Sequence, residues 1–150
     1  MKTLFEPAVV EEVKTRIGNV RPDSIRQWGK MNVAQAVAHC ANSLEMAVGD
    51  LRPPRVLIGR IVGPLIRRLA LGNDRPMERN SPTAPALFIT GERDLDVERE
   101  RLIALIERFT AGGAAQCTTH PHAFFGRLTP EQWAELMYKH LDHHLRQFSA

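Results

Sequence analysis

The chain has 150 residues, of which 43% are hydrophobic and 25% charged, a composition typical of one globular domain with a core of ordinary size. Lysine and arginine outnumber aspartate and glutamate by only 20 to 17 and are dispersed, so we do not expect nucleic acid as a partner. The two cysteines, Cys40 and Cys117, are too few for a disulfide framework, and no charged and then apolar leader precedes Glu6. We therefore expect a single cytoplasmic domain over residues 1–150.

The first predicted helix covers residues 6–17. Its apolar side chains recur at helical spacing, and Gly18-Asn19 ends the pattern. Residues 22–29 follow as a turn or a brief helix.

The second predicted helix covers residues 33–48 and is rich in alanine, a strong helix former. Asn32 followed three residues later by Gln35 matches a capping box at its start, and Gly49 closes it. At 100° per residue, Gln35, His39 and Asn42 lie on one face of this helix.

Residues 56–71 form a cationic amphipathic segment with an expected kink at Pro64. The segment is too short and too charged to span a bilayer. We expect it to pack over the other helices or at a subunit contact, and not to touch a membrane surface.

The third main helix is predicted over residues 94–110, with acidic residues early and Gly112-Gly113 after its end. A proline-rich surface loop is predicted over residues 72–85, ahead of this helix. Residues 87–90 are the only stretch that suggests a strand.

The last helix begins at Thr129, a capping residue followed by Pro130 in the first turn, after an irregular connection over residues 118–128. Four main helices predict an all-α, up-down four-helix bundle with an extra amphipathic helical segment between the second and third helices.

The C-terminal helix carries His140 and His144 one turn apart, roughly 40° from each other around the axis. Both lie within the apolar stripe of this helix, whereas His143 lies on its polar border. Asp142 points away from both, so it fits pairing with an arginine, a lysine or a neighbouring loop better than acting on a metal-bound water.

His39, His140 and His144 together would supply three neutral nitrogen ligands from two helices. This is the ligand count of a catalytic metal that keeps an open position, and we expect zinc or nickel because imidazole suits both. Gln35 and Asn42 would orient the ligand shell or a substrate carbonyl, unless they only hydrogen-bond between helices. A satisfied core histidine is the alternative for His39.

The sequence offers two other metal-site patterns. A His-Glu-x-x-His protease motif is excluded because Leu141 occupies the position of its glutamate. Cys117, His120 and His122 form a rival cluster of metal-binding residue types without a fourth ligand nearby.

With these residues placed, the chain resembles the DinB-like superfamily of damage-inducible four-helix-bundle metalloproteins. It looks closest to a branch of uncharacterised domains with the C-terminal signature Lys-His-Leu-Asp-His-His-Leu-Arg-Gln-Phe. The matching pieces are residues 28–32, 35–40, 80–83, 120–129 and 138–148.

The resemblance implies a bundle, often dimeric, with a divalent metal held by one histidine of the second helix and two of the fourth. These positions correspond to His39, His140 and His144, with His143 and Asp142 as further pocket candidates. Better-understood relatives use the metal to activate a low-molecular-weight thiol, such as bacillithiol or mycothiol, toward a small electrophilic substrate. We therefore expect a metal-dependent thiol S-transferase, or else a non-catalytic metal- or ligand-binding bundle that acts as a stress-response or sensor protein.

Overall fold

The computed structural model describes residues 1–81 and 83–150; Pro82, in the predicted loop 72–85, lies outside the described residues. The described chain is all-helical, as predicted, and its nearest approach to a strand is an isolated bridge between His122 and Gly126. The elements are α1 (Pro7–Asn19), α2 (Val33–Val48), α3 (Leu57–Ala70), the short 3-10 helix η1 (Pro85–Leu87), α4 (Leu95–Gln116) and α5 (Pro130–Gln147).

Capping boxes begin the two helices that carry the histidines. At α2, the Asn32 side chain accepts from the Gln35 amide at 2.9 Å, and the Asn32 amide donates to Gln35 Oε1 at 3.0 Å. Thr129 and Gln132 make the same reciprocal pair at α5, at 3.2 and 3.0 Å. Such a cap contributes about 1 kcal/mol, so both helix starts are set by local sequence.

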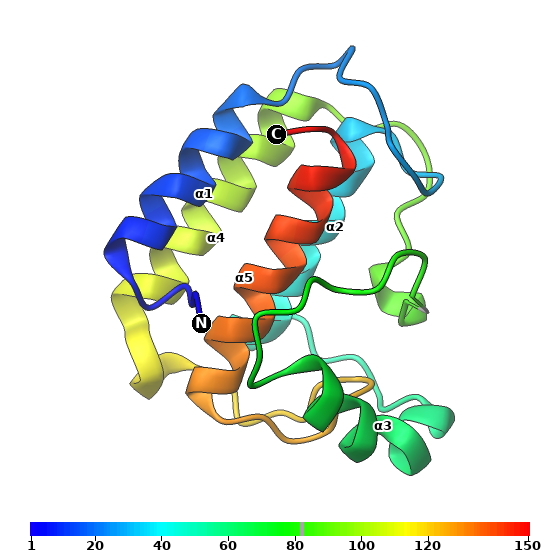
Figure 1. Ribbon diagram of the computed structural model, residues 1–150, viewed down its shortest axis with the longest axis vertical. Coiled ribbons are helices and arrows are strands. Elements are labelled where there is room, and N and C mark those ends of the chain that lie inside the picture. Colours follow the sequence, from blue (N-terminus) through cyan, green and yellow to red (C-terminus); the bar gives the residue numbers. More distant parts are fainter. Residues whose placement is uncertain (82) are drawn as a thin grey trace.

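The helices α1, α2, α4 and α5 lie side by side, with α1 next to α4 and α5 next to α2 (Figure 1). Their apolar faces meet in a shared hydrophobic cluster. Its largest fully buried side chains are Trp133, Leu4, Ile17, Leu44, Leu102, Ile106 and Leu141. This packing brings the middle of α2 against the second half of α5, where the histidines lie.

Two local predictions differ from the structure. The stretch 87–90 is not a strand: its first residue ends η1, and the chain that follows is unpaired. The third main helix extends beyond residue 110 to Gln116, with a break at Gly113 (φ 56°, ψ −156°), because the glycine interrupts the helix without ending it. The stretch 22–29, predicted as a turn or a brief helix, begins with a turn, in which the Ser24 amide donates to the Arg21 carbonyl at 3.0 Å.

The amphipathic helix α3 lies apart from the other four helices, at the lower right of Figure 1. It rests on the chain through Gly59 and Gly63, where a Cβ would come within 2.6 and 2.2 Å of the Phe124 carbonyl oxygen. Because its glycine side packs on the connection before α5 and not on another helix, the expectation that this segment packs over the other helices is wrong. Its large aliphatic side chains point outward, and Leu57 is 76% exposed.

No helix in the described part of the chain combines the length and apolar character needed to cross a membrane.

Candidate metal centre

The three predicted ligands come together in space. His39 of α2 is 4% exposed, and His140 and His144 of α5 are half-buried beside it. One nitrogen from each ring lies within 4.8 Å of the other two. The ring centroids are 4.7 Å apart for the pair on α5 and 4.8 Å from His39 to each of them. His140 and His144 are brought together by their spacing of four residues in one helix, and His39, about 100 positions earlier in the chain, completes the cluster.

The His39 ring is oriented by the backbone. Its Nδ1 lies 2.9 Å from the carbonyl oxygen of Leu87, at the end of η1. A carbonyl can only accept, so Nδ1 carries the proton and Nε2 of the neutral ring presents a lone pair. That Nε2 lies 2.9 Å from His140 Nε2.

The His144 ring is oriented by Gln147, one turn further along α5. The Gln147 amide nitrogen donates to the Trp28 carbonyl at 2.7 Å, which directs the amide oxygen toward His144 Nδ1 at 2.9 Å. His144 therefore donates through Nδ1 and keeps Nε2 free, the arrangement usual for a histidine that binds metal. Sequence reasoning missed Gln147, although its spacing of three residues from His144 was a usable signal.

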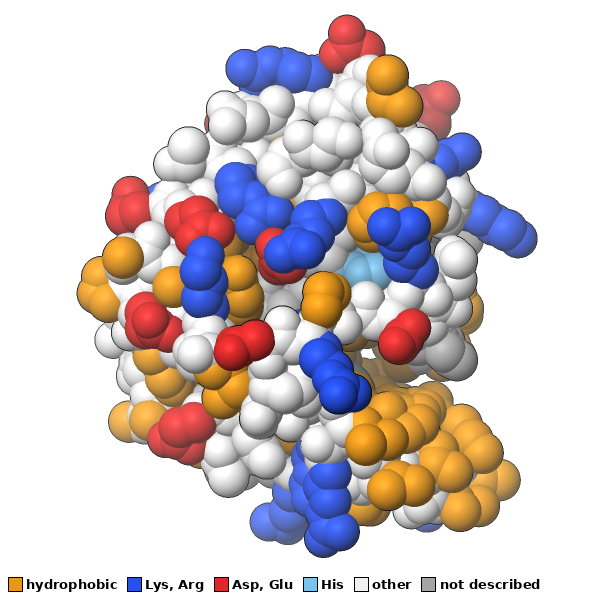
Figure 2. Space-filling model, in the orientation of Figure 1, with side chains coloured by type: hydrophobic (Ala, Val, Ile, Leu, Met, Phe, Trp, Pro, Cys, Tyr) orange, Lys and Arg blue, Asp and Glu red, His pale blue; other side chains and the backbone are white. Residues whose placement is uncertain are grey.

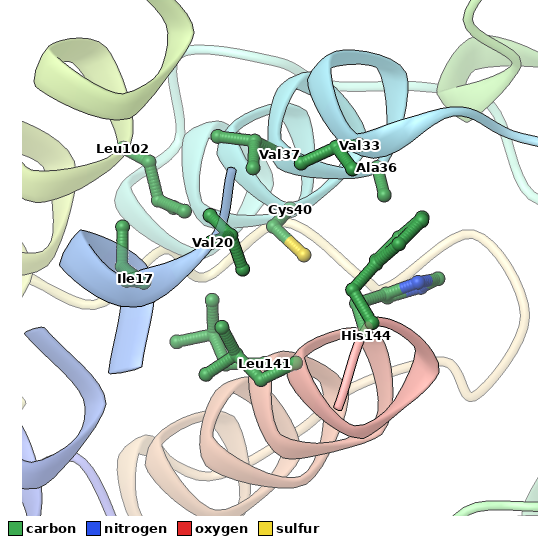
Figure 3. A pocket seen from close by; sticks show the side chains of 11 residues that line it. Ile17, Val20, Val33, Ala36, Val37, Cys40, Leu102, Leu141 and His144 are labelled. Atoms are coloured by element: carbon green, nitrogen blue, oxygen red, sulfur yellow. The ribbon is translucent and has the colours of Figure 1, made fainter. Parts of the chain in front are cut away.

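Figure 3 shows His144 at the edge of a small apolar cavity of about 20 Å³ between α2 and α5. Cys40 lies on the α2 side of this cavity and Leu141 on the α5 side. Burial raises the pKa of the Cys40 thiol far above its usual range, so this sulfur stays protonated. Cys40 is accordingly a structural thiol beside the cluster.

Burial is the main cause that lowers the pKa of all three imidazoles. For His140 and His144 the neighbouring imidazoles lower the pKa further, and the pKa of His144 falls to about 3. All three rings are therefore neutral at pH 7, which is the form that binds metal.

The cluster fits a divalent transition metal. Two nitrogens bound tetrahedrally at roughly 2.0–2.1 Å from zinc lie about 3.3 Å apart. The separations here begin at 2.9 Å and stay within 4.8 Å, so small side-chain rotations would suffice. Three ligands leave one tetrahedral position for water or a substrate atom.

Three of the predicted pocket residues are engaged elsewhere. The Gln35 side chain caps α2 and donates to the Gly91 carbonyl at 3.0 Å. Asn42 accepts from Arg101 of α4 at 2.9 Å, a hydrogen bond between helices, which was the alternative role expected for it. Asp142 pairs with arginines, at 2.8 Å from Arg16 Nη1 and 2.8 Å from Arg146 Nε.

His143 lies beside the cluster and joins it to a surface loop. Its ring packs edge-on against His144 at 5.0 Å between centroids, and its Nε2 lies 3.4 Å from Trp28 Nε1. The guanidinium of Arg79 stacks over the Trp28 ring, 4.1 Å from the ring centroid. Trp28 thus packs on His143 beside the cluster, a role that sequence reasoning did not assign.

The rival cluster does not assemble. His120 Nε2 lies 3.1 Å from the Pro53 carbonyl, and His122 Nδ1 accepts the amides of Phe124 and Phe125 at 3.1 Å each. Burial raises the pKa of Cys117 to about 11, so its thiol is protonated at neutral pH. Across residues 1–81 and 83–150, the one group able to hold a metal ion is His39, His140 and His144.

The fold and the cluster define an all-helical protein with a candidate three-histidine metal site. The chain belongs to the family described as "protein of unknown function (DUF1569)", whose model matches residues 7–150. A search of the curated proteins finds no match, and neither does a search of the solved structures.

Proposed function

We propose that this protein is a divalent-metal-dependent enzyme whose metal is held by His39, His140 and His144. The observation that carries the proposal is the convergence of three neutral imidazoles, two of them anchored through Nδ1 so that Nε2 is available. Building such a cluster requires two distant helices and two orienting acceptors, which a merely buried histidine does not need.

We further propose that α1, α2, α4 and α5 are an up-down four-helix bundle of the DinB-like type, with α3 inserted between its second and third helices. The pairwise packing of these four helices and the placement of the histidines on facing helices support this assignment.

For the reaction we propose transfer of a low-molecular-weight thiol to a small electrophile. A divalent ion bound by neutral ligands keeps its full charge, and it would favour the thiolate form of a thiol in the open position. The protein's own part is to keep three rings neutral and to orient His39 and His144. Zinc and nickel are the proposed metals, because imidazole suits both.

The test begins with elemental analysis of protein purified without a metal-affinity step, compared with His140→Ala. We expect the wild-type chain to retain zinc or nickel and the variant to lose it. His120→Ala is the matched control, because His120 bonds to the Pro53 carbonyl away from the cluster. Equal metal content in wild type and His140→Ala would overturn the ligand assignment.

Catalysis is tested separately, with the metal-loaded protein, a panel of thiols and an electrophilic chromogenic substrate. We expect turnover that depends on both the metal and the thiol. Absence of turnover and of thiol binding across the panel would favour the second candidate below.

The second candidate is a non-catalytic metal-binding protein in which the ion only fixes the helices, as in a stress-response or sensor protein. The observation that favours it is the size of the cavity beside His144, which at about 20 Å³ is about the size of one water molecule and too small for a thiol substrate. This candidate predicts metal-dependent stability without thiol binding.

A further inference from the structure

The helix α3 exposes one continuous apolar stripe to solvent. Figure 2 shows these hydrophobic side chains gathered at the lower right, where α3 lies in Figure 1. We call them the α3 stripe: Leu57 (76% exposed), Ile58 (57%), Ile61 (74%), Leu65 (61%), Ile66 (36%) and Leu69 (65%). A stripe of this size is uncommon on a surface that meets only water.

The packing of α3 holds this stripe outward. The glycine side fits against the backbone at Phe124, and only a residue without a Cβ fits there at Gly63. Arg67 Nη1 donates to the Arg127 carbonyl at 2.6 Å, and the Val56 amide donates to the Ala123 carbonyl at 2.9 Å. Rotating α3 about its axis to bury the stripe would break these contacts. The contacts therefore keep the stripe exposed.

The segment that carries the stripe has charged side chains of one sign only. Residues 51–73 contain five arginines and neither aspartate nor glutamate. Among the described residues, Arg60 and Arg68 have no side-chain hydrogen bond and no ion pair, so both can serve a ligand. An apolar stripe with one free arginine at its border and another within it matches a surface that is apolar beneath and anionic above.

We propose that α3 docks on an anionic lipid bilayer, lying flat in the headgroup region with the stripe toward the acyl chains. Its 14 residues span about 21 Å along that plane. The arginines then meet lipid phosphates, each strengthening binding about fivefold. This proposal replaces the expectation that the segment does not touch a membrane, and it does not depend on the metal centre.

A second copy of the chain is the less fitting occupant. A stable interface takes about 20–30 residues from each partner, more than this 14-residue helix presents. Arg68 also lies within the stripe, only about 20° from Leu57 around the helix axis. Pairing two stripes would therefore bring like charges into the apolar contact, whereas in a membrane the arginine can extend to the headgroups.

The test is co-sedimentation of the full chain with vesicles of phosphatidylcholine alone, or of phosphatidylcholine mixed with phosphatidylglycerol. We expect binding to the anionic vesicles only, falling as sodium chloride is raised because the arginines are then screened. Ile61→Ser/Leu65→Ser should weaken binding at least about tenfold. Arg60→Gln/Arg68→Gln should weaken it about fivefold for each arginine.

Val97→Ser is the matched control, because Val97 on α4 is 61% exposed, the same fraction as Leu65, but lies outside the stripe. It should bind as the wild type does. All these positions are exposed, so the variants should fold, which far-UV circular dichroism checks.

No preference for anionic vesicles at low salt would overturn the proposal. Equal weakening by Val97→Ser would overturn it as well. So would a dimer, measured by light scattering on a sizing column, that Ile61→Ser/Leu65→Ser converts to monomer, because the stripe would then belong to a contact between copies.

Discussion

His39 Nε2 and His140 Nε2 lie 2.9 Å apart, although 100 residues separate them along the chain. The His39 Nδ1 proton is committed to the Leu87 carbonyl, so His39 can only accept at Nε2. Without a metal, the contact requires a proton on His140 Nε2. A bound ion would instead use both lone pairs, so binding a metal at this pair would be thermodynamically linked to the fold.

Metal removal should lower the thermal stability of the wild-type protein. At a free metal concentration 100 times the dissociation constant, binding stabilises the fold by about 2.7 kcal/mol, a shift of roughly 5–10 °C for a chain of this size. Differential scanning calorimetry with and without a chelator measures the shift. His140→Ala should show no chelator-dependent shift, and an equal shift in both proteins would place the metal elsewhere.

Gln147→Leu should weaken metal binding by about 10- to 100-fold, because it removes the acceptor that orients His144. Gln147→Glu should recover most of that loss, since a carboxylate oxygen can still accept from His144 Nδ1. Competitive titration with a chromogenic chelator measures both affinities. A role of Gln147 limited to its bond with the Trp28 carbonyl would leave the two variants equally impaired, because both lose that donor.

Acidification should destabilise the fold through His122, independently of the metal. Burial, followed by the nearby positive charge of Arg55, lowers the pKa of His122 from 6.5 to about 4. Below pH 6.5 the unfolded chain binds the proton and the folded chain does not, so stability falls as the pH falls toward 4. The loss amounts to about 2 kcal/mol at pH 5.

His122→Asn tests this, because an amide oxygen can accept the Phe124 and Phe125 amides without titrating. Urea unfolding of both metal-free proteins at pH 7 and pH 5 gives the comparison. The variant should lose about 2 kcal/mol less than the wild type over that interval. An identical pH dependence in both proteins would show that His122 is not neutral in the fold.

Gly63→Ala should detach or displace α3, because the added Cβ would meet the Phe124 carbonyl oxygen at 2.2 Å. We expect a cost of about 1–3 kcal/mol or a local loss of packing. Gly18→Ala is the control, since a Cβ at Gly18 meets nothing within 4 Å. It should stabilise the chain by about 0.5–1 kcal/mol.

Amide hydrogen exchange distinguishes a local from a global effect in Gly63→Ala. Faster exchange confined to α3 and residues 123–126 is the expected result. Unchanged exchange in α3 would contradict the close approach of these two backbones.

Much of the fold follows from short-range patterns. The capping boxes at Asn32 and Thr129 and the stop at Gly49 are interactions between residues at most four apart, so the bounds of α2 and the start of α5 could be predicted from the sequence. The pairing of His140 with His144 is of the same kind, because helical geometry alone places them one turn apart.

Other features depend on contacts between distant segments. The 2.9 Å approach of His39 to His140, the Leu87 carbonyl behind His39 and the contact of Trp28 with His143 join residues 48 to 115 positions apart. Helical periodicity reports which face of a helix is apolar, but not what that face meets. In α3 the glycines pack inward and the aliphatic stripe faces solvent, which the periodicity of the sequence could not show.

The sequence by itself determined the helical class, the principal helices and the three candidate ligands, because each depends on local periodicity or capping. Only the tertiary structure decided that the three rings converge, that Gln147 rather than Gln35 or Asn42 orients one of them, and that α3 presents its apolar side to solvent. The physical reason is that a side chain's partners are set by how whole helices pack, and packing energies are summed over many residues that no short sequence pattern contains.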